Sequence, residues 1–204
     1  MYYCTKKSKK IQTKDTYMGK LYFYYGTMGA GKTALAINKA YEFMNHSQPT
    51  LVCLPSITKK DKLESRNGYC IDVDLIIDFE NLEESKKFLE RFNTVETPIF
   101  VIDEAQFLTS LQVKTLRKLS DTKNTLVFCF GLLTDFQLNL FQGSKSLITY
   151  ANSFREIPSM CEMKYCRKKA QCNLRTNHES NQIVLNKDQY TSLCLECYEK
   201  ATNY

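Results

Sequence analysis

The sequence lacks long apolar runs, and it has no apolar segment near its start. No hydrophobic stretch approaches the ~20 consecutive apolar residues that a membrane-spanning helix needs. Residues 1–10 contain four lysines where a secretory signal would have its hydrophobic core. We therefore expect a cytoplasmic protein with no membrane partner, and a basic, disordered tail over residues 1–19.

A strong excess of charge is also absent. The 204 residues carry a formal net charge of +6, and the lysine-rich tail supplies part of it. This balance favours anionic ligands such as phosphates over a dedicated nucleic-acid surface, although solubility alone would explain it equally well. We expect no nucleic-acid partner. The length suits one α/β domain with a small appendage.

Residues 21–45 have the pattern of a strand, a glycine-rich loop and a helix. Glycine lets the backbone curl so that several N–H groups converge on one anion, and the following helix N-terminus favours negative charge. In such a loop Lys32 would reach the outer phosphates of a nucleotide and the Thr33 hydroxyl would bind Mg²⁺. An ordinary turn before a helix is the alternative, but the flanking strand and helix patterns favour nucleoside triphosphate binding. The predicted ATP and magnesium ligands here are Gly26, Thr27, Met28, Gly29, Ala30, Gly31, Lys32 and Thr33.

The apolar run 98–102 ends in two acids, Asp103 and Glu104. A buried parallel strand has this appearance when its carboxyl end delivers a carboxylate to a ligand crevice. A solvated turn would give the same letters, but the phosphate loop makes Asp103 a candidate second magnesium ligand. Because side chains alternate along a strand, Glu104 should turn elsewhere and be free to act as a base.

The remaining patterns complete a parallel α/β fold. Asn81 is expected to cap a helix, since its side chain can accept hydrogen bonds from the first turn. Residues 55–68 lack periodicity and are predicted to form a mobile loop beside the nucleotide. The other predicted strands are Leu51–Leu54, Val73–Ile77, Thr125–Phe130 and Arg155–Met160, and the predicted helices are Leu82–Phe92, Thr109–Leu119 and Ser144–Phe154.

Four cysteines near the end of the chain have metal-ligand spacing. Cys161-x4-Cys166 and Cys194-x2-Cys197 form two pairs about thirty residues apart, as in a zinc ribbon. A redox site is the competing interpretation, but it needs one reactive pair and not two pairs around a β-rich insert. The sequence therefore predicts structural Zn²⁺ with four thiolate ligands and no open position for catalysis.

Three kinds of nucleotide-using protein fit a phosphate loop. A GTPase needs an Asn-Lys-x-Asp motif, and Asn186-Lys187-Asp188 has the wrong spacing. The Asp-Glu-Ala-Gln run at 103–106 is similar to helicase-type ATPases, which need two such domains. A single-domain ATPase acting as an assembly or nucleic-acid-associated motor stays open. A small-molecule kinase explains more of the chain, because the cysteine-rich end could close over an acceptor.

Several motifs occur together in one order. They are the phosphate loop ending at Thr33, Asp103-Glu104-x-Gln106-Phe107, Gly131-Leu-x-Thr-Asp-Phe136-x4-Phe141, and the four cysteines with Asp188-x-Tyr190 before Cys194. Over roughly residues 20–200 the chain resembles the zinc-containing cellular type of thymidine kinase, the type II family.

The resemblance implies a fold and an activity. It implies a parallel-sheet P-loop nucleotide-binding domain at 20–158, followed by a zinc-binding lid domain at 159–204 whose long loop wraps the thymine. The activity would be transfer of the γ-phosphate of ATP to the 5′-hydroxyl of thymidine, and of deoxyuridine, in nucleotide salvage for DNA synthesis. The family also implies a cytoplasmic homotetramer that is inhibited by thymidine triphosphate.

The resemblance also assigns roles to residues. Glu104 would be the catalytic base, and Asp103, Thr33 and Gln106 would lie on the ATP and magnesium side. The residues implied for the thymidine pocket are Met28, Phe107, Phe136, Phe141, Ile183 and Tyr190.

The chain departs from the family pattern at two places. Thr58 and Lys60 stand where the family often has Asp and Arg, which leaves open how that loop helps to bind phosphate or metal. Asn186-Lys187 replaces a pair of glycines in the long loop. Asn tolerates positive φ better than most residues, so the turn can survive this replacement.

Overall fold

The computed structural model describes residues 19–93, 96–175 and 190–202. Its centre is a six-stranded sheet made of β1 (Lys20–Tyr25), β2 (Thr50–Pro55), β5 (Leu75–Ile77), β6 (Ile99–Ile102), β7 (Leu126–Gly131) and β8 (Ser153–Glu156). The strand order is β5-β2-β6-β7-β1-β8, and every neighbouring pair is parallel. The predicted parallel α/β fold is therefore confirmed.

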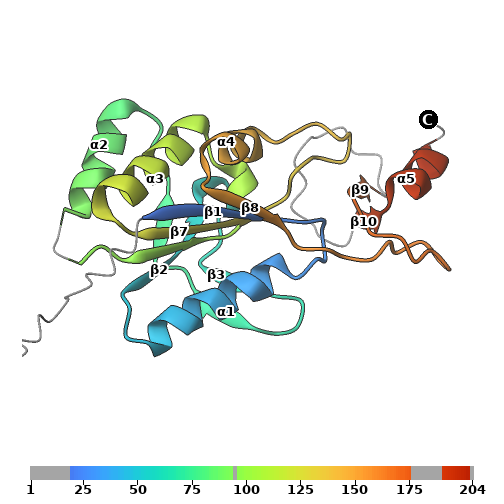
Figure 1. The fold of residues 1–204 in the computed structure, drawn as a ribbon, viewed down its shortest axis with the longest axis horizontal. Helices are drawn as coiled ribbons and strands as arrows, with labels where there is room; N and C mark the ends of the chain where they lie inside the picture. Colours follow the sequence, from blue (N-terminus) through green and yellow to red (C-terminus); the bar gives the residue numbers. More distant parts are fainter. Residues whose placement is uncertain (1–18, 94–95, 176–189, 203–204) are drawn as a thin grey trace, which may run out of the picture.

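Helices cover both faces of the sheet (Figure 1). One face carries α1 (Lys32–Asn45), and the other carries α2 (Leu82–Arg91), α3 (Ser110–Lys123) and α4 (Gln142–Tyr150). Strand side chains alternate between two buried clusters, so that Phe100 of β6 packs on the α2–α3–α4 side and Val101 on the α1 side. This two-sided burial is what a fully apolar parallel strand requires.

Residues 55–68 were predicted as a loop without regular structure, and that part of the prediction is wrong, although residues 65–67 do line the cavity beside the phosphate loop. A short helical turn, η1 (Ser56–Thr58), is followed by a hairpin of β3 (Lys62–Glu64) and β4 (Cys70–Asp72). Leu63 is buried against α1, which gives this short segment an anchor. Asn81 does cap α2, since its side chain accepts hydrogen bonds from the N–H groups of Glu83 and Glu84.

Two predicted helix boundaries are also wrong. The helix predicted to end at Phe154 stops at Tyr150, because Asn152 turns to the sheet and exchanges hydrogen bonds with the backbone of Leu21. Phe154 belongs instead to β8, the edge strand beside β1. The helix predicted to end at Leu119 continues to Lys123, and Asn124 ends it in the left-handed conformation.

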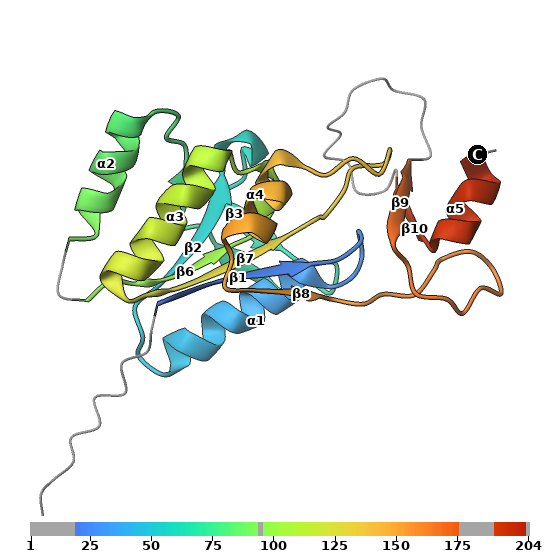
Figure 2. The ribbon, with the colours of Figure 1, turned by 45° about the horizontal axis from the view of Figure 1, so that its top comes forward.

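Residues 159–175 and 190–202 are here called the lid. It contains β9 (Cys172–Arg175), β10 (Tyr190–Leu193) and α5 (Leu195–Thr202), and β9 and β10 pair antiparallel. The lid lies beyond one end of the sheet, and the segment leaving β8 leads to it (Figures 1 and 2). We call the rest of the described chain the body.

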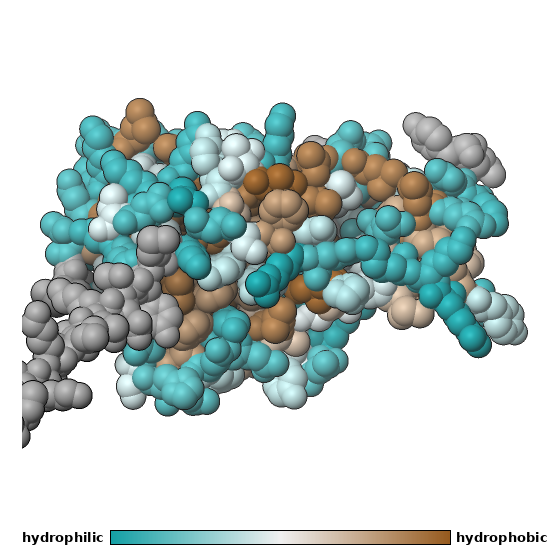
Figure 3. All heavy atoms as spheres, viewed as in Figure 1, coloured by the Kyte–Doolittle hydropathy of each residue, from teal (hydrophilic) through white to brown (hydrophobic). Residues whose placement is uncertain are grey.

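Exposed apolar side chains lie at the edge of the sheet formed by β8. Hydrophobic side chains gather over α4 and β8 in Figure 3, where Ile148 and Phe154 are exposed. No helix within the described ranges combines the length and apolar character needed to cross a bilayer. The predictions for the N-terminal tail, for Ile183 and for Asn186-Lys187 concern residues outside the described ranges.

Candidate active site

The loop from Gly26 to Gly31 joins β1 to α1 as predicted. Gly29 and Gly31 have φ values of 80° and 84°, a conformation that residues with side chains rarely adopt. The Lys32 ammonium group folds back over the loop and donates hydrogen bonds to the carbonyls of Gly26 (3.1 Å) and Thr27 (2.7 Å). The eight predicted phosphate-binding residues thus form one curled loop at a helix N-terminus, which suits an anion.

Asp103 lies at the carboxyl end of β6 and reaches this loop. The Thr33 hydroxyl donates a hydrogen bond of 2.7 Å to its carboxylate, although the two residues are 70 positions apart. Burial, together with the negative charge of Glu104, raises the pKa of Asp103 to about 6. A buried carboxylate beside a hydroxyl at a phosphate loop offers the oxygen ligands that Mg²⁺ prefers, so these residues fit the ion.

Glu104 is turned away from Asp103 by the backbone. We expected strand alternation to separate the two carboxylates, but β6 ends at Ile102 and Glu104 has a left-handed conformation with φ 51°. It caps η2 (Ala105–Phe107), and Glu104 lines a cavity of about 170 Å³ together with Lys32 and Thr33. A strained non-glycine residue of this kind is common where a side chain must be aimed.

Gln106 holds the Glu104 carboxylate in place. The Gln106 side chain is buried; its amide donates a 2.7 Å hydrogen bond to Glu104 and its oxygen accepts the N–H of Leu132 at 3.0 Å. Gln106 was predicted among the ATP and magnesium residues. Gln106 is not among the described residues that line the cavity, but it is hydrogen-bonded to Glu104, which does line it.

The predicted aromatic residues form two groups. The rings of Phe107 and Phe141 meet edge to face with centroids 5.8 Å apart. Phe136, in the loop after β7, and Tyr190, at the start of β10, are joined by Arg175: its guanidinium lies 4.2 Å from the Phe136 ring centroid and donates a 2.9 Å hydrogen bond to the Tyr190 hydroxyl. Nothing in the sequence distinguished Arg175 from other arginines.

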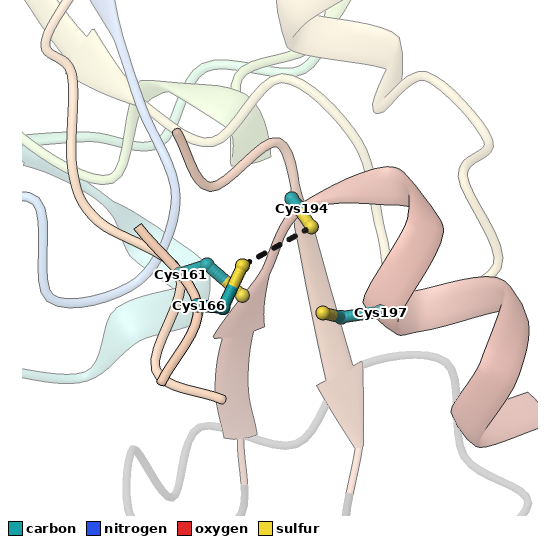
Figure 4. Close-up of side chains that lie close together, drawn as sticks. All are labelled: Cys161, Cys166, Cys194 and Cys197. Carbon is teal, nitrogen blue, oxygen red and sulfur yellow. Dashed lines mark hydrogen bonds between the residues drawn. The ribbon is translucent and has the colours of Figure 1, made fainter. Parts of the chain in front are cut away.

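The four predicted zinc ligands converge in the lid. The sulfur atoms of Cys161, Cys166, Cys194 and Cys197 all lie within 4.8 Å of one another (Figure 4). The Sγ atoms of Cys166 and Cys194 are 3.9 Å apart, close to the separation of about 3.8 Å expected for thiolates at 2.3 Å from a tetrahedral zinc ion.

The ionisation of these thiols also fits a cation. Burial opposes ionisation of Cys161, but hydrogen bonds from the backbone of Cys194 and Met163 lower its pKa to about 7. The hydrogen bond with Cys194, followed by burial, raises the pKa of Cys197 to about 12. A cluster that ionises one thiol easily and another with difficulty needs a positive ion before all four can be thiolates.

The lid binds the phosphate loop directly. The Met28 N–H donates to the Asn173 side chain at 2.8 Å, and the Met28 carbonyl accepts the Ser192 hydroxyl at 2.5 Å. The hydroxyls of Thr27 and Ser159 are 2.6 Å apart. Small polar residues give no signal in a sequence, so these contacts were not predicted. They bring the phosphate loop and the lid into direct contact.

Comparisons with known proteins agree with this arrangement. A model of the thymidine kinase family matches residues 19–198. The chain is 34% identical over 193 residues to the thymidine kinase of Haemophilus influenzae strain 86-028NP, covering 90% of this chain and 97% of the relative. It is 34% identical over 194 residues to that of Enterobacteria phage T4, covering 91% of this chain and 98% of the relative.

The chain belongs to the thymidine kinase family. This confirms the resemblance found in the sequence motifs. Membership makes the chain an ATP-dependent phosphotransferase, and the cysteine cluster is consistent with structural zinc. The family match extends through the phosphate loop, the acids after β6 and the four cysteines.

Proposed function

We propose that the chain transfers the γ-phosphate of ATP to the 5′-hydroxyl of thymidine, and of deoxyuridine, in nucleotide salvage. One observation carries the proposal: Glu104 lines the same cavity as Lys32 and Thr33, at the end of the body that the lid contacts. An acid placed between a phosphate loop and an acceptor site is what phosphoryl transfer to a hydroxyl requires.

The triphosphate side of the site is formed by the loop and by α1. The N–H groups from Gly26 to Lys32 would bind the β- and γ-phosphates, and Lys32 would leave its loop carbonyls to contact them. Thr33 and Asp103 would hold Mg²⁺. When bound, this ion would supply positive charge that neutralises the charge developing on the phosphate oxygens.

Glu104 would act as the general base. Its carboxylate would accept the proton of the 5′-hydroxyl as that oxygen attacks the γ-phosphorus in line. Gln106 keeps the carboxylate aimed into the cavity through the 2.7 Å hydrogen bond. Positioning of the two reactants and neutralisation of charge would supply the rest of the acceleration.

The nucleoside side would be formed by body and lid together. The proposed pocket residues are Met28, Phe107, Phe136, Phe141, Ile183 and Tyr190. Support comes from Arg175, which joins Phe136 of the body to Tyr190 of the lid. The four cysteines would hold Zn²⁺ as a structural ion, since a closed set of thiolates leaves no position for a substrate.

A phosphorylation assay tests the activity. The purified protein is offered ATP and magnesium with thymidine, deoxyuridine, deoxycytidine, deoxyguanosine or no acceptor. We expect monophosphate only from thymidine and deoxyuridine. Phosphate release that needs no acceptor would instead indicate the alternative, a small P-loop ATPase with a zinc ribbon that acts as an assembly or nucleic-acid-associated motor.

Replacement of the base tests the assignment of Glu104. Glu104→Gln should lower kcat by roughly 10²–10⁴, the scale of general-base catalysis, with ADP affinity almost unchanged. Glu90→Gln, at an exposed position on α2, is the matched control and should keep wild-type rates. Near-normal turnover of Glu104→Gln would show that another group takes the proton.

The proposal extends to assembly and regulation. We propose a cytoplasmic homotetramer that is inhibited by thymidine triphosphate, with the domain boundary near residue 158. The exposed Ile148 and Phe154 over α4 and β8 support a protein interface at that edge. Light scattering after size-exclusion chromatography and inhibition curves with thymidine triphosphate test these points.

A further inference from the structure

The hairpin of β3 and β4 carries a second cation to the phosphate cavity. The cavity lined by Gly29, Lys32 and Glu104 is also lined by the hairpin turn, residues 65–67, which includes Arg66. We propose that Arg66 is a further catalytic residue, whose guanidinium contacts the phosphoryl group during transfer. The inference rests on the proposed function, because it assigns a role in that reaction.

The turn that carries Arg66 is built from several hydrogen bonds. The N–H of Ser65 donates to the Tyr69 carbonyl at 2.8 Å, and the Ser65 side chain accepts the N–H of Tyr69 at 3.0 Å. The N–H of Gly68 donates to the Ser65 carbonyl at 3.0 Å, and its φ of 82° closes the turn. Arg66 is therefore presented on a defined loop.

The hairpin is fixed to the helix that begins at the phosphate loop. Leu63 is only 3% exposed and belongs to the same buried cluster as Ala36, Ile37 and Ala40 of α1. The Tyr41 hydroxyl, also on α1, donates a 3.4 Å hydrogen bond to the Cys70 carbonyl of β4. Because α1 supports both the hairpin and the loop, their relative position is set by the core.

The guanidinium lies against the loop at a glycine. A Cβ atom added to Gly29 would be 3.3 Å from Nη1 of Arg66 and 3.7 Å from Oε1 of Glu162. The space left by the missing side chain is thus used by Arg66 from the hairpin and Glu162 from the lid. Glu162 is held in turn by the N–H of Ser192, at 2.8 Å. Arg66, on the hairpin, therefore lies where the phosphate loop meets the lid.

The chemistry of the cavity favours arginine there. Among the described residues that line it, Lys32 and Arg66 are the cations. The charge of a phosphoryl group in transfer spreads over three equatorial oxygens, which one ammonium group cannot contact from every side. A planar guanidinium presents several donors in a fork and can bind two of those oxygens at once.

Lys60 does not take this position. It stands where the resembled family often has an arginine, but its side chain is exposed and does not line the cavity in the described structure. Lys59, with φ 51°, ends the short turn η1 just before it. Arg66, six residues later on the hairpin turn, is the residue that lines the cavity.

The experiment compares Arg66→Gln, Arg66→Lys and the control Lys60→Gln in the full chain. We expect Arg66→Gln to lower kcat by on the order of 10²–10³, as for loss of one oxyanion donor and no more than for loss of an arginine finger. Arg66→Lys should recover less than a tenth of the lost rate, because it lacks the fork. Lys60→Gln should stay within about threefold of the wild type in this comparison.

Binding gives a second readout that does not depend on turnover. Affinity is measured for ADP with magnesium, and for the same mixture with aluminium fluoride and thymidine, which imitates the phosphoryl group in transfer. Arg66→Gln should weaken the second by roughly 100-fold and change the first by less than threefold, as for a contact made only in the transition state.

Three results would overturn the inference. They are a kcat of Arg66→Gln within threefold of the wild type, equal losses of affinity for both mixtures, or the larger defect in Lys60→Gln. If the wild type does not phosphorylate thymidine, the proposed function is wrong, and the aluminium fluoride comparison still decides whether Arg66 contacts a phosphoryl group.

Discussion

The body and the lid are stabilised in different ways. The body has two extended apolar clusters on either side of its sheet, with large buried side chains such as Phe23, Phe100 and Phe130. Within residues 159–175 and 190–202 of the lid, the buried cluster has five members, three of them cysteines: Cys161, Cys172, Leu193, Cys194 and Tyr198. Hydrophobic burial can fold the body, but so small a cluster needs a metal ion to fold the lid.

The body and the lid also have different proposed roles in the reaction. Lys32, Asp103 and Glu104 all belong to the body, where the sheet and α1 fix them. The nucleoside pocket draws Tyr190 from the lid. Chemistry would thus depend on the part with a strong apolar core, whereas acceptor binding would depend on the part that needs zinc. Met28 is one of the residues that join the two parts, because the lid binds both its N–H and its carbonyl.

Removal of zinc should have the largest effect of all the changes considered, because it should unfold the lid and leave the body intact. If it did not, the proposed difference between lid and body would be wrong. We expect Cys194→Ser, or a strong chelator, to unfold the lid and abolish thymidine binding, since structural zinc contributes roughly 10 kcal/mol or more to such small units. ADP should still bind to the body, within about tenfold of normal, because the loop and its helix remain. Calorimetric titrations with each ligand measure both.

Cys70→Ser is the control for this experiment. Cys70 is exposed on the hairpin and does not belong to the four-cysteine cluster, so the variant should bind both ligands normally. Normal thymidine binding by a zinc-free chain would show that the lid folds without metal. Absence of bound zinc in the native protein would have the same meaning.

A cavity in the core of the body should act on both ligands at once. Phe100→Ala removes a fully buried ring that packs edge to face on Phe92 at 5.0 Å, which should destabilise the protein by about 3–5 kcal/mol. As the temperature is raised, binding of ADP and binding of thymidine should be lost together when the body unfolds. Leu82→Ala, at a residue that is 69% exposed, should leave stability nearly unchanged. A selective loss of thymidine binding in Phe100→Ala would contradict the division described above.

The sequence predicted the parts of the site that are local. The phosphate loop is fixed by Gly26, Gly31, Lys32 and Thr33 within a few residues, and the cysteine pairs have spacings set by one metal ion. The apolar run before Asp103 showed where a buried strand ends. Each of these signals depends on neighbours in the chain.

The parts that were missed depend on distant contacts. The hairpin was predicted as a loop because β3 and β4 have three residues each and are secured by distant contacts, such as the packing of Leu63 on α1. Asn152 ended a helix early through its bonds to Leu21. The positions of Arg66 and Arg175 depend on contacts between the lid and the body. No spacing in the sequence predicts these contacts.

Replacement of Asp103 should have the next largest effect on stability, and it should stabilise the protein, whereas Phe100→Ala destabilises it. The pKa of Asp103 is about 6 in the folded chain, above the value near 3.9 of an unfolded aspartate, so its ionised form lowers stability above pH 6 and has no such effect below about pH 4. Without magnesium, Asp103→Asn should therefore raise stability by about 1–3 kcal/mol at pH 8 and by almost nothing at pH 4. Denaturant unfolding at both pH values measures this gain.

Activity and a surface variant complete the test of Asp103. Asp103→Asn should lose magnesium-dependent turnover, because the amide is a poor ligand for the ion. Asp78→Asn, at an exposed position, should change neither property. A loss of stability in Asp103→Asn at pH 8 would indicate that the buried charge is favourable in the body, against its raised pKa.

The smallest effect should come from the contact between lid and loop, and it is the one that joins the two regions. Ser192→Ala removes the 2.5 Å hydrogen bond to the Met28 carbonyl, and a net loss of about 1 kcal/mol corresponds to roughly fivefold in affinity. Because Met28 lies in the phosphate loop and in the proposed nucleoside pocket, both ADP and thymidine should bind more weakly, and binding of one should favour the other less than in the wild type.

Thr191→Ala, on the same strand without this bond, should keep the wild-type coupling. Weaker thymidine binding with unchanged ADP binding and coupling would mean that the lid touches the loop without influencing it, and that the two regions work independently.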